Sequence, residues 1–194
     1  MIGNTTNIMI VGVGGQGTLL ASKILGNAAL RQNCDVKVSE VHGMSQRGGS
    51  VVTYVKYGDK VYSPVICRGE ADIILAFEQL EALRWLPYLK AGGTIIASTH
   101  KINPAPVMMG AEKYPEGIIN TIAEMGVKVI DADAFAVAQK AGNEKASNVV
   151  LIGILAKLQK DSVKKEIYVE ALRESAPKLF EANLPAFNSG YDLK

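Results

Sequence analysis

The sequence predicts an α/β protein, with a single Rossmann-like domain whose mostly parallel sheet has helices on both faces and an inserted antiparallel hairpin. Three observations predict this class. An apolar run, Ile8–Val13, ends in four glycines within six positions, 12–17. Strand-like and helical patterns then alternate along the chain. The chain has 194 residues, enough for one well-cored domain over residues 1–194 and too few for two.

The elements can be assigned in order from hydrophobic period and breakers. Leu20, Ile24 and Ala28 recur at a helical spacing of four behind the glycines. Apolar and polar residues alternate on either side of Gly58-Asp59, which predicts the antiparallel hairpin. The expected elements after the glycines are a helix over 18–30, a strand over 35–41, a hairpin over 51–64, a strand over 72–77, a helix over 78–91 closed by Gly92-Gly93, a strand over 94–99, a helix over 116–125, a strand over 127–131, a helix over 147–158, an amphipathic stretch over 163–182 and a docked tail.

Composition excludes several function classes. Hydrophobic residues make up 48% of the chain and charged residues 21%, as in ordinary folded proteins. The net charge is only +2, and no basic cluster is interleaved with aromatic residues, which argues against nucleic acid as a partner. No basic leader and no apolar stretch of ~20 residues occurs, which argues against a membrane segment.

The two cysteines, Cys34 and Cys67, are not part of a C-x-x-C motif. The chain therefore cannot by itself supply the thiolates of an iron–sulfur cluster or a structural zinc site. We expect both to be buried thiols in a reducing compartment, and hence a cytoplasmic protein.

The glycine-rich stretch carries the first candidate site. Gly12, Gly14 and Gly17 fit the G-x-G-x-x-G turn between a strand and a helix. A helix that begins there directs free N–H groups and the positive end of its dipole at one spot, which suits a phosphate. A glycine-rich corner without a ligand is the alternative interpretation.

A second glycine-rich loop follows the second predicted strand. Gly43, Gly48 and Gly49 frame Ser45-Gln46-Arg47. Here the backbone can approach a ligand, and Arg47 can offer a planar fork of donors to a phosphate or carboxylate. Because both loops follow the carboxyl ends of strands, we expect the glycines and Arg47 to meet at one edge of the sheet. A tight turn in which Arg47 caps nearby carbonyls is equally compatible with the spacing.

Catalytic groups are scarce. Glu40 lies 23 residues beyond Gly17, where a nicotinamide-binding fold has an acid for a ribose hydroxyl, but a salt-bridged strand end is as good an interpretation. His42 and His100 have no metal-ligand spacing. The pair Asp131 and Asp133 could act as catalytic carboxylates, although helix N-capping suits Asp133 better.

Several blocks together resemble a known family. They are "GVGGQGTLLASKILG", "EVHGMSQRGGSV", "SPVI" at 63–66, "AD" at 71–72 and Asn148, four residues before an Ile-Gly pair. The chain resembles the pyruvate/ketoisovalerate ferredoxin oxidoreductase gamma-domain family over nearly its whole length. The "EVHGMSQRGG" block is most similar to the small-subunit group that acts on indolepyruvate.

The resemblance implies a partner-dependent oxidoreductase. A large subunit would carry thiamine diphosphate and iron–sulfur clusters and oxidatively decarboxylate an aryl 2-oxo acid, with coenzyme A as acyl acceptor and ferredoxin as electron acceptor. This chain would hold no catalytic residue and no metal, and would be silent alone. Val13 stands where some relatives have a basic residue, which leaves more of the phosphate contact to Arg47. The residues expected to contact coenzyme A are Gly12, Gly14, Gly15, Gln16, Gly17, Ser45, Gln46, Arg47 and Gly48.

Two other functions remain open at this point. A free-standing nicotinamide-dependent dehydrogenase would use the same glycines with Glu40, and a purely structural subunit would leave the turn unoccupied. Ligand binding separates the three functions: the oxidoreductase subunit should bind coenzyme A, the dehydrogenase a dinucleotide, and the structural subunit neither.

Two segments bear on association. The irregular connection with Pro104, Pro106 and Pro115 is suited to contact a partner. The apolar stretch 147–158 predicts a helix buried in the core or under a subunit interface. If both lie near an exposed apolar surface, the isolated chain should self-associate.

Overall fold

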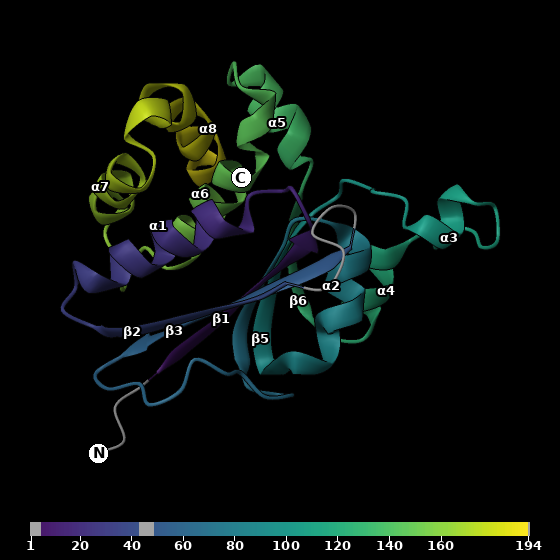
Figure 1. Ribbon diagram of the computed structural model, residues 1–194, viewed down its shortest axis with the longest axis horizontal. Coiled ribbons are helices and arrows are strands. Elements are labelled where there is room, and N and C mark those ends of the chain that lie inside the picture. The colour runs from purple at the N-terminus through teal and green to yellow at the C-terminus, as the bar shows by residue number, and fades with distance from the viewer. Residues whose placement is uncertain (1–4, 43–48, 194) are drawn as a thin grey trace.

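The computed structural model describes residues 5–42 and 49–193, which form a six-stranded sheet between two helical layers (Figure 1). The spatial order of the strands is β2-β3-β1-β4-β5-β6. The pairs β1–β4, β4–β5 and β5–β6 are parallel. Strand β3 is antiparallel to both of its neighbours, β1 and β2. The strands are β1 (Thr6–Val13), β2 (Asp35–His42), β3 (Ser50–Gly58), β4 (Ala71–Ala76), β5 (Leu89–Ser98) and β6 (Lys128–Ala132).

The helices cover both faces of the sheet, as the sequence predicts (Figure 1). Helices α1 and α5 to α8 lie over one face, and α2 and α4 over the other. The helices are α1 (Thr18–Leu30), α2 (Gln79–Trp85), α3 (Ala105–Met108), α4 (Ile118–Glu124), α5 (Ala134–Lys140), α6 (Ser147–Leu158), α7 (Lys165–Ser175) and α8 (Phe180–Asp192), with short 3-10 turns at Leu86–Tyr88, Glu144–Ala146 and Pro177–Leu179.

Strand β1 is buried on both faces, which explains its uninterrupted apolar sequence. Ile8 and Ile10 belong to the core under α1 and α6, while Met9 and Val11 belong to the core under α2. All four side chains are 0% exposed. Each such side chain stabilises the fold by roughly 1.5–3 kcal/mol relative to exposure. The first predicted strand is therefore the centre of the molecule.

The inserted antiparallel hairpin exists, but its position differs from the prediction. Its arms are β2 and β3, whereas residues 59–70 form no strand. The alternation after Gly58 does not lead to pairing because the Asp35 carboxylate, at the start of β2, accepts a hydrogen bond from the N–H of Val61 (2.8 Å). That contact holds the chain across the end of the hairpin instead of turning it back along β3.

The predicted helix over 78–91 is shorter than expected. Helix α2 ends at Trp85, and a 3-10 turn that contains Pro87 leads directly into β5. Proline has no N–H for the next helical hydrogen bond, so the helix stops before it. Gly92-Gly93 consequently lie within β5 and do not close a helix.

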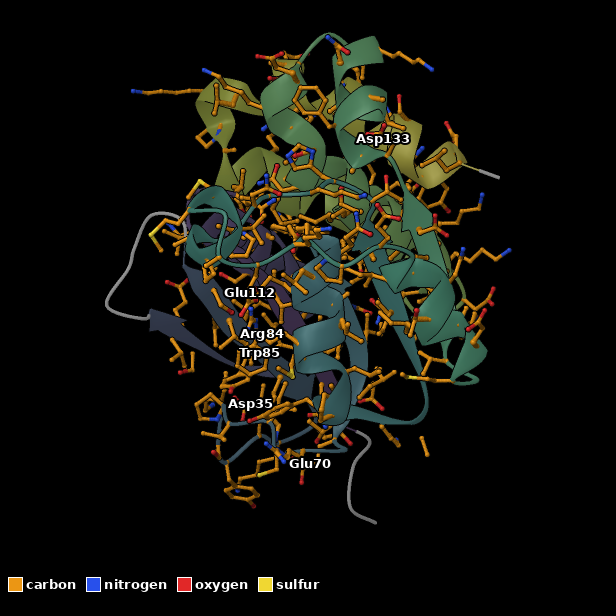
Figure 2. All side chains as sticks on the ribbon, turned by 90° about the vertical axis from the view of Figure 1, so that its right-hand side faces the viewer. Asp35, Glu70, Arg84, Trp85, Glu112 and Asp133 are labelled. Carbon is orange, nitrogen blue, oxygen red and sulfur yellow. The ribbon has the colours of Figure 1, made fainter. Side chains whose placement is uncertain are left out.

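The prediction for Asp133 is confirmed. Its carboxylate accepts a hydrogen bond from the N–H of Ala136 (2.9 Å), so Asp133 is the N-cap of α5. Figure 2 shows Asp133 where β6 passes into α5. Asp131 is an exposed residue of β6.

Helix α6 is a core helix, and α8 covers it within the same chain. Nine of its twelve residues are buried. The two helices approach so closely that a Cβ at Gly153 would lie 2.2 Å from the carbonyl oxygen of Phe187, and one at Gly190 would lie 2.0 Å from that of Val150. The predicted tail is therefore a docked helix, and α6 provides no exposed apolar surface for self-association.

Two further predictions concern the surroundings of the protein. Among the described residues, no helix combines the length and the apolar character that crossing a bilayer requires. Both cysteines are free thiols, but Cys67 is exposed and Cys34 half-buried. The expectation that both are buried is wrong, because Cys67 lies in the irregular segment that follows β3.

Candidate functional site

The glycine turn, residues 14–17, joins β1 to α1 at the carboxyl edge of the parallel strands. Gly15 and Gly17 have φ angles of +101° and +81°, which residues other than glycine rarely adopt. Gly17 is the N-cap of α1. Among the described residues, none accepts a hydrogen bond from the N–H of Gly15 or Gly17, or from the first N–H groups of α1. The turn thus presents several donors at the positive end of a helix dipole.

The side chain of Gln16 supports the turn from the protein side. Its Oε1 accepts a hydrogen bond from the N–H of Val13 (2.7 Å), and its Nε2 donates one to the carbonyl of Phe77 (2.9 Å). A Cβ at Gly12 would lie 2.8 Å from Gln16 Oε1, so glycine at that position makes room for this brace. The polar side-chain atoms of Gln16 are used within the protein, and its backbone faces the turn.

The turn is hydrogen-bonded to the end of the second glycine-rich loop. The N–H of Gly14 donates to the carbonyl of Gly49 (2.9 Å). In the sheet, Val13 is opposite Ser50 and His42 is opposite Val51. Both ends of the loop therefore lie at the edge of the sheet that carries the glycine turn. The predicted ligand residues Ser45, Gln46, Arg47 and Gly48 lie outside the described residues, and their role stays a prediction.

Asn148, the first buried residue of α6, holds the turn from the other side. Its Nδ2 donates to the carbonyl of Gly17 (3.2 Å), and its Oδ1 accepts from the N–H of Val149 (2.9 Å). A Cβ at Gly17 would lie 2.4 Å from Asn148 Nδ2. Position 148 contributes to the family resemblance, but sequence reasoning assigned it no role, since 131 residues separate it from Gly17.

A cavity of about 460 Å³ opens beside the turn, at the carboxyl ends of β1, β4 and β5. In this fold class, ligands bind at that edge. The His100 ring stacks on Phe135 with a centroid separation of 5.8 Å, and Lys145 supplies a positive charge. A Cβ at Gly15 would meet no atom of the described residues within 4 Å, so these residues leave space open on this side of the turn. The cavity is lined by Gly15, Gln16, Phe77, Ser98, His100, Ile102, Phe135, Glu144, Lys145 and Ser147.

The junction between β4 and α2, residues 77–79, joins the loops around the cavity. Its Phe77 carbonyl accepts from Gln16, as described above. Glu78 is only 1% exposed, and its carboxylate accepts hydrogen bonds from the N–H of Ile102 (3.3 Å) and from the Tyr114 hydroxyl. The Gln79 side chain donates to the carbonyl of Thr99 (2.8 Å). Burial and the adjacent Glu78 carboxylate raise the pKa of Tyr114, so its hydroxyl stays a donor.

A second buried carboxylate on α2 holds the start of β3. Glu81 accepts hydrogen bonds from the Ser50 hydroxyl, from Arg84 Nε (3.0 Å) and from Trp85 Nε1 (3.2 Å). Figure 2 shows Arg84 and Trp85 on α2. Because Ser50 directly follows the second glycine-rich loop, this cluster anchors one end of that loop. Sequence reasoning assigned no role to either buried carboxylate, Glu78 or Glu81.

Among the described side chains, the remaining candidates do not come together as a catalytic group. Glu40 accepts a hydrogen bond from the Ser22 hydroxyl of α1 (3.2 Å) and is separated from β1 by β3. The side chain of His42 lies outside the description. In the part of the chain that the structure describes, no cluster of three His, Cys, Asp or Glu side chains could hold a metal ion.

Comparison with known proteins assigns the family. The model of the pyruvate ferredoxin/flavodoxin oxidoreductase family matches residues 7–193. The chain belongs to this family.

The relatives of this oxidoreductase chain are subunits of larger enzymes. Indolepyruvate oxidoreductase subunit IorB of Thermococcus kodakarensis is 45% identical over 193 residues, covering 95% of this chain and 93% of the relative. The IorB subunit of Methanothermobacter thermautotrophicus is 38% identical, with 95% of each chain covered. The 2-oxoglutarate synthase subunit KorC of Methanothermobacter marburgensis is 31% identical, covering 96% and 95%. The chain is accordingly a small subunit of a 2-oxoacid ferredoxin oxidoreductase, a multisubunit enzyme.

Solved structures of the same family share the fold. The gamma subunit of keto/oxoacid ferredoxin oxidoreductase from Geobacter sulfurreducens superposes with a TM-score of 0.71 at 25% identity, with 96% of each chain covered. The 2-oxoglutarate:ferredoxin oxidoreductase of Magnetococcus marinus matches with a TM-score of 0.71 at 19% identity, covering 96% of this chain but 30% of that longer one. In that enzyme the fold is one part of a longer polypeptide.

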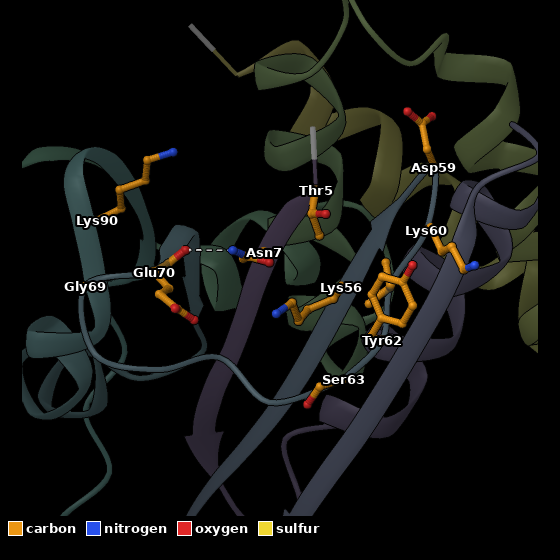
Figure 3. Close-up of a pocket in the computed structure, with 11 residues that line it drawn as sticks. Thr5, Asn7, Lys56, Asp59, Lys60, Tyr62, Ser63, Gly69, Glu70 and Lys90 are labelled. Atoms are coloured by element: carbon orange, nitrogen blue, oxygen red, sulfur yellow. Dashed lines mark hydrogen bonds between the residues drawn. The ribbon is translucent and has the colours of Figure 1, made fainter. Parts of the chain in front are cut away.

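A larger cavity of this oxidoreductase subunit, about 850 Å³, lies at the opposite end of the sheet (Figure 3). Three of its charged groups are engaged within the protein: Lys90 pairs with Asp72 (3.0 Å), Lys56 Nζ donates to the Val65 carbonyl (3.1 Å), and the Glu70 carboxylate accepts from the N–H of Cys67 (2.9 Å). The Asn7 side chain donates to the Glu70 carbonyl (2.9 Å). Figure 2 shows Glu70 at the end of the molecule opposite to Asp133. This cavity is remote from the glycine turn, so the candidate site remains at the carboxyl edge.

Proposed function

We propose that this chain is the small subunit of an oxidoreductase that converts indolepyruvate or a related aryl 2-oxo acid to its acyl-coenzyme A, and that the subunit contributes to coenzyme A binding and to assembly of the complex. The identity of 45% to a subunit named for indolepyruvate supports the substrate class. When bound to the large subunit, thiamine diphosphate would activate the 2-oxo acid and iron–sulfur clusters would pass electrons to ferredoxin. We place the complex in the cytoplasm, where its free thiols would stay reduced.

The observation that carries the proposal is the group of N–H donors at the glycine turn for which the described residues offer no acceptor, beside an open cavity. The diphosphate of coenzyme A suits such donors, because N–H groups at a helix start favour an anion. Lys145 on the cavity wall adds a positive charge. The N–H of Gly14 is not available, because it is bonded to Gly49. The N–H of Gln16 is not available either, because it donates to the Val13 carbonyl (3.2 Å). We therefore assign the diphosphate contact to the amides of Gly15, Gly17 and the first residues of α1, and to Arg47.

The Magnetococcus marinus enzyme has 2-oxoglutarate, coenzyme A and succinyl-coenzyme A bound in its structure. At 19% identity that likeness supports the fold of this chain and transfers no contact. The position of the turn at the carboxyl edge agrees with the general rule for ligands in α/β sheets.

A nicotinamide-dependent dehydrogenase is disfavoured by the strand order. In the dinucleotide-binding fold, the acid that holds the ribose ends the strand next to β1. Here the antiparallel β3 lies between β1 and β2, and Glu40 contacts Ser22 of α1. A purely structural subunit would bind neither coenzyme A nor a dinucleotide.

The test is an assay of the complex co-expressed with its large subunit. We expect indolepyruvate-dependent reduction of an artificial electron acceptor by the complex and none by this chain alone. Loss of a charge-assisted hydrogen bond typically costs ~1.5–3 kcal/mol. Arg47→Ala should therefore raise the KM for coenzyme A about ten- to a hundredfold, and Arg47→Lys less, with the KM for the 2-oxo acid nearly unchanged.

Arg68→Ala is the matched control, since Arg68 is exposed at the other end of the sheet. If Arg47→Ala leaves coenzyme A kinetics unchanged but prevents assembly, the loop is an interface element and the site assignment is wrong. Oxidation of a 2-oxo acid by this chain without a partner would contradict the subunit assignment.

A further inference from the structure

The irregular connection between β5 and α4, residues 99–117, forms an arm that projects from the body of the molecule (α3 in Figure 1). Helix α3 within this arm contains no buried residue. At its end Met108 is 70% exposed and Met109 76% exposed. The arm therefore displays two adjacent apolar side chains to solvent, although charged residues of the arm, Glu112 and Lys113 among them, are exposed as well.

The arm is closed by its own hydrogen bonds. The N–H of Val107 donates to the carbonyl of Pro104 (2.9 Å), and the N–H of Ala111 donates to that of Pro106 (2.9 Å). The two prolines also restrict the backbone of the arm before folding. The methionines are consequently displayed on a defined turn.

One buried carboxylate bonds to both ends of the arm at its base. Glu78 Oε1 accepts from the N–H of Ile102 near the start of the arm and from the Tyr114 hydroxyl near its end. A buried carboxylate is costly unless it is hydrogen-bonded, so these contacts favour one placement of the arm. The Lys101 ammonium lies 5.6 Å from the centre of the Tyr114 ring and adds a second link across the base.

Apolar side chains held rigidly in water are a recognised sign of a binding surface, and methionine adapts well to a partner. Two residues at the base of the arm, His100 and Ile102, line the cavity beside the glycine turn. A partner that packs on the tip of the arm would therefore stand next to the opening of that cavity.

We propose that the arm is a docking element for the large subunit of the oxidoreductase, with Met108 and Met109 inserted into an apolar recess close to its active centre. This inference rests on the proposed function. The large subunit is the occupant because, under the proposed function, it brings the cofactors that must face this cavity, whereas the described residues of this chain contain no group of three His, Cys, Asp or Glu side chains that could hold a metal ion. A second copy of this chain would bring none either. Where the fold is part of a longer polypeptide, the rest of that chain can take the same place.

The experiment measures the affinity of the full-length chain for its cofactor-loaded large subunit under anaerobic conditions. We expect Met108→Asp combined with Met109→Asp to weaken binding at least a hundredfold, because two apolar anchors are replaced by charges that must be desolvated. Both residues are exposed, so the midpoint of thermal unfolding of the isolated chain should not change. Met125→Asp is the matched control: Met125 is 59% exposed and follows α4 near the start of β6. It should bind as the wild type does.

Three results would overturn the inference. If the wild-type chain binds and the double variant binds equally well, the arm is not a docking element. If the double variant dissociates a homodimer in sedimentation while its affinity for the large subunit is unchanged, the occupant is a second copy. If the wild-type chain does not bind the large subunit at all, the proposed function fails and this inference fails with it.

Discussion

The contact between α6 and α8 and the junction between β4 and α2 both join segments that are far apart in the sequence, but by opposite means. The helices meet backbone to backbone, because Gly153 and Gly190 leave no side chain between them. At the junction, Gln16, Glu78 and Gln79 reach across by hydrogen bonds. One contact depends on shape and the other on polar groups.

The difference reflects what each contact has to hold. Helices satisfy their own backbone groups, so they can pack on apolar surfaces alone. The glycine turn and the arm are irregular, and their free N–H and C=O groups need partners wherever they are buried. A junction rich in buried acceptors and donors can therefore place several loops around one cavity.

The helix contact should be the most sensitive to a single methyl group. A Cβ in Gly153→Ala would lie 2.2 Å from the Phe187 carbonyl oxygen and 2.8 Å from the Tyr191 nitrogen, so the helices must move apart. We expect a loss of about 3 kcal/mol in the free energy of unfolding, measured by urea denaturation. Gly142→Ala is the control, with φ +92° and nothing within 4 Å of the new Cβ. It should cost about 1 kcal/mol from backbone strain. Equal losses in the two variants would show that the close approach is not decisive.

Removing a buried acceptor at the junction should cost less stability than Gly153→Ala but should loosen the local structure more. Glu78→Ala leaves the N–H groups of Ile102 and Glu81 without their acceptor, at a cost of about 1–3 kcal/mol. Faster hydrogen exchange at Ile102 and easier proteolysis within residues 99–117 should accompany it. Glu78→Gln can keep one acceptor oxygen for Ile102 and Tyr114, so it should retain the arm and lose mainly the N-cap bond to Glu81. An arm that remains protected in Glu78→Ala would contradict this account.

The smallest effect is expected at a polar link within the helical layer. The Tyr168 hydroxyl donates to Gln159 Oε1, and Gln159 Nε2 donates to the Tyr57 hydroxyl (2.9 Å). Tyr168→Phe should cost about 1 kcal/mol near pH 8, because Gln159 loses a donor.

The same link predicts a dependence on alkaline pH. Burial raises the pKa of Tyr168 well above its usual value, with the neighbouring Tyr57 as a smaller cause. The folded state therefore keeps its proton where the unfolded state loses it. Stability should be constant below the unfolded pKa of about 10 and fall as the pH rises above it. This decline should be smaller in Tyr168→Phe and unchanged in Tyr62→Phe, whose ring is 83% exposed. Identical alkaline profiles for the wild type and Tyr168→Phe would refute it.

Much of the regular fold could be predicted because period and burial agree. The apolar run of β1 is buried on both faces, and Asp133 caps α5 as its position suggested. The hairpin was misplaced because the alternation on either side of Gly58 is a local signal. The contact from Asp35 to Val61, which diverts the chain, joins residues 26 apart. Pro87 is a local signal that indicates the earlier end of this helix.

The site was only partly predictable for the same reason. The glycine turn follows from local spacing and lies where expected. The groups that hold it come from distant positions, Phe77 and Asn148 among them, and no periodicity marks them. Glu78 and Glu81 resemble solvent-facing helix residues in the sequence. Their burial depends on Tyr114 and Ser50, which reach this helix only in the folded chain.

The antiparallel position of β3 has a consequence for how this family can diversify. In a plain doubly wound sheet, the segment after the second strand leads into a helix, and a change in its length displaces that helix. Here the segment after β2 returns directly to β3, and its two ends are fixed side by side at His42 and Val51. Closing a longer loop between fixed ends costs little. The length and sequence of residues 43–49 can therefore change without displacing β1 or the core.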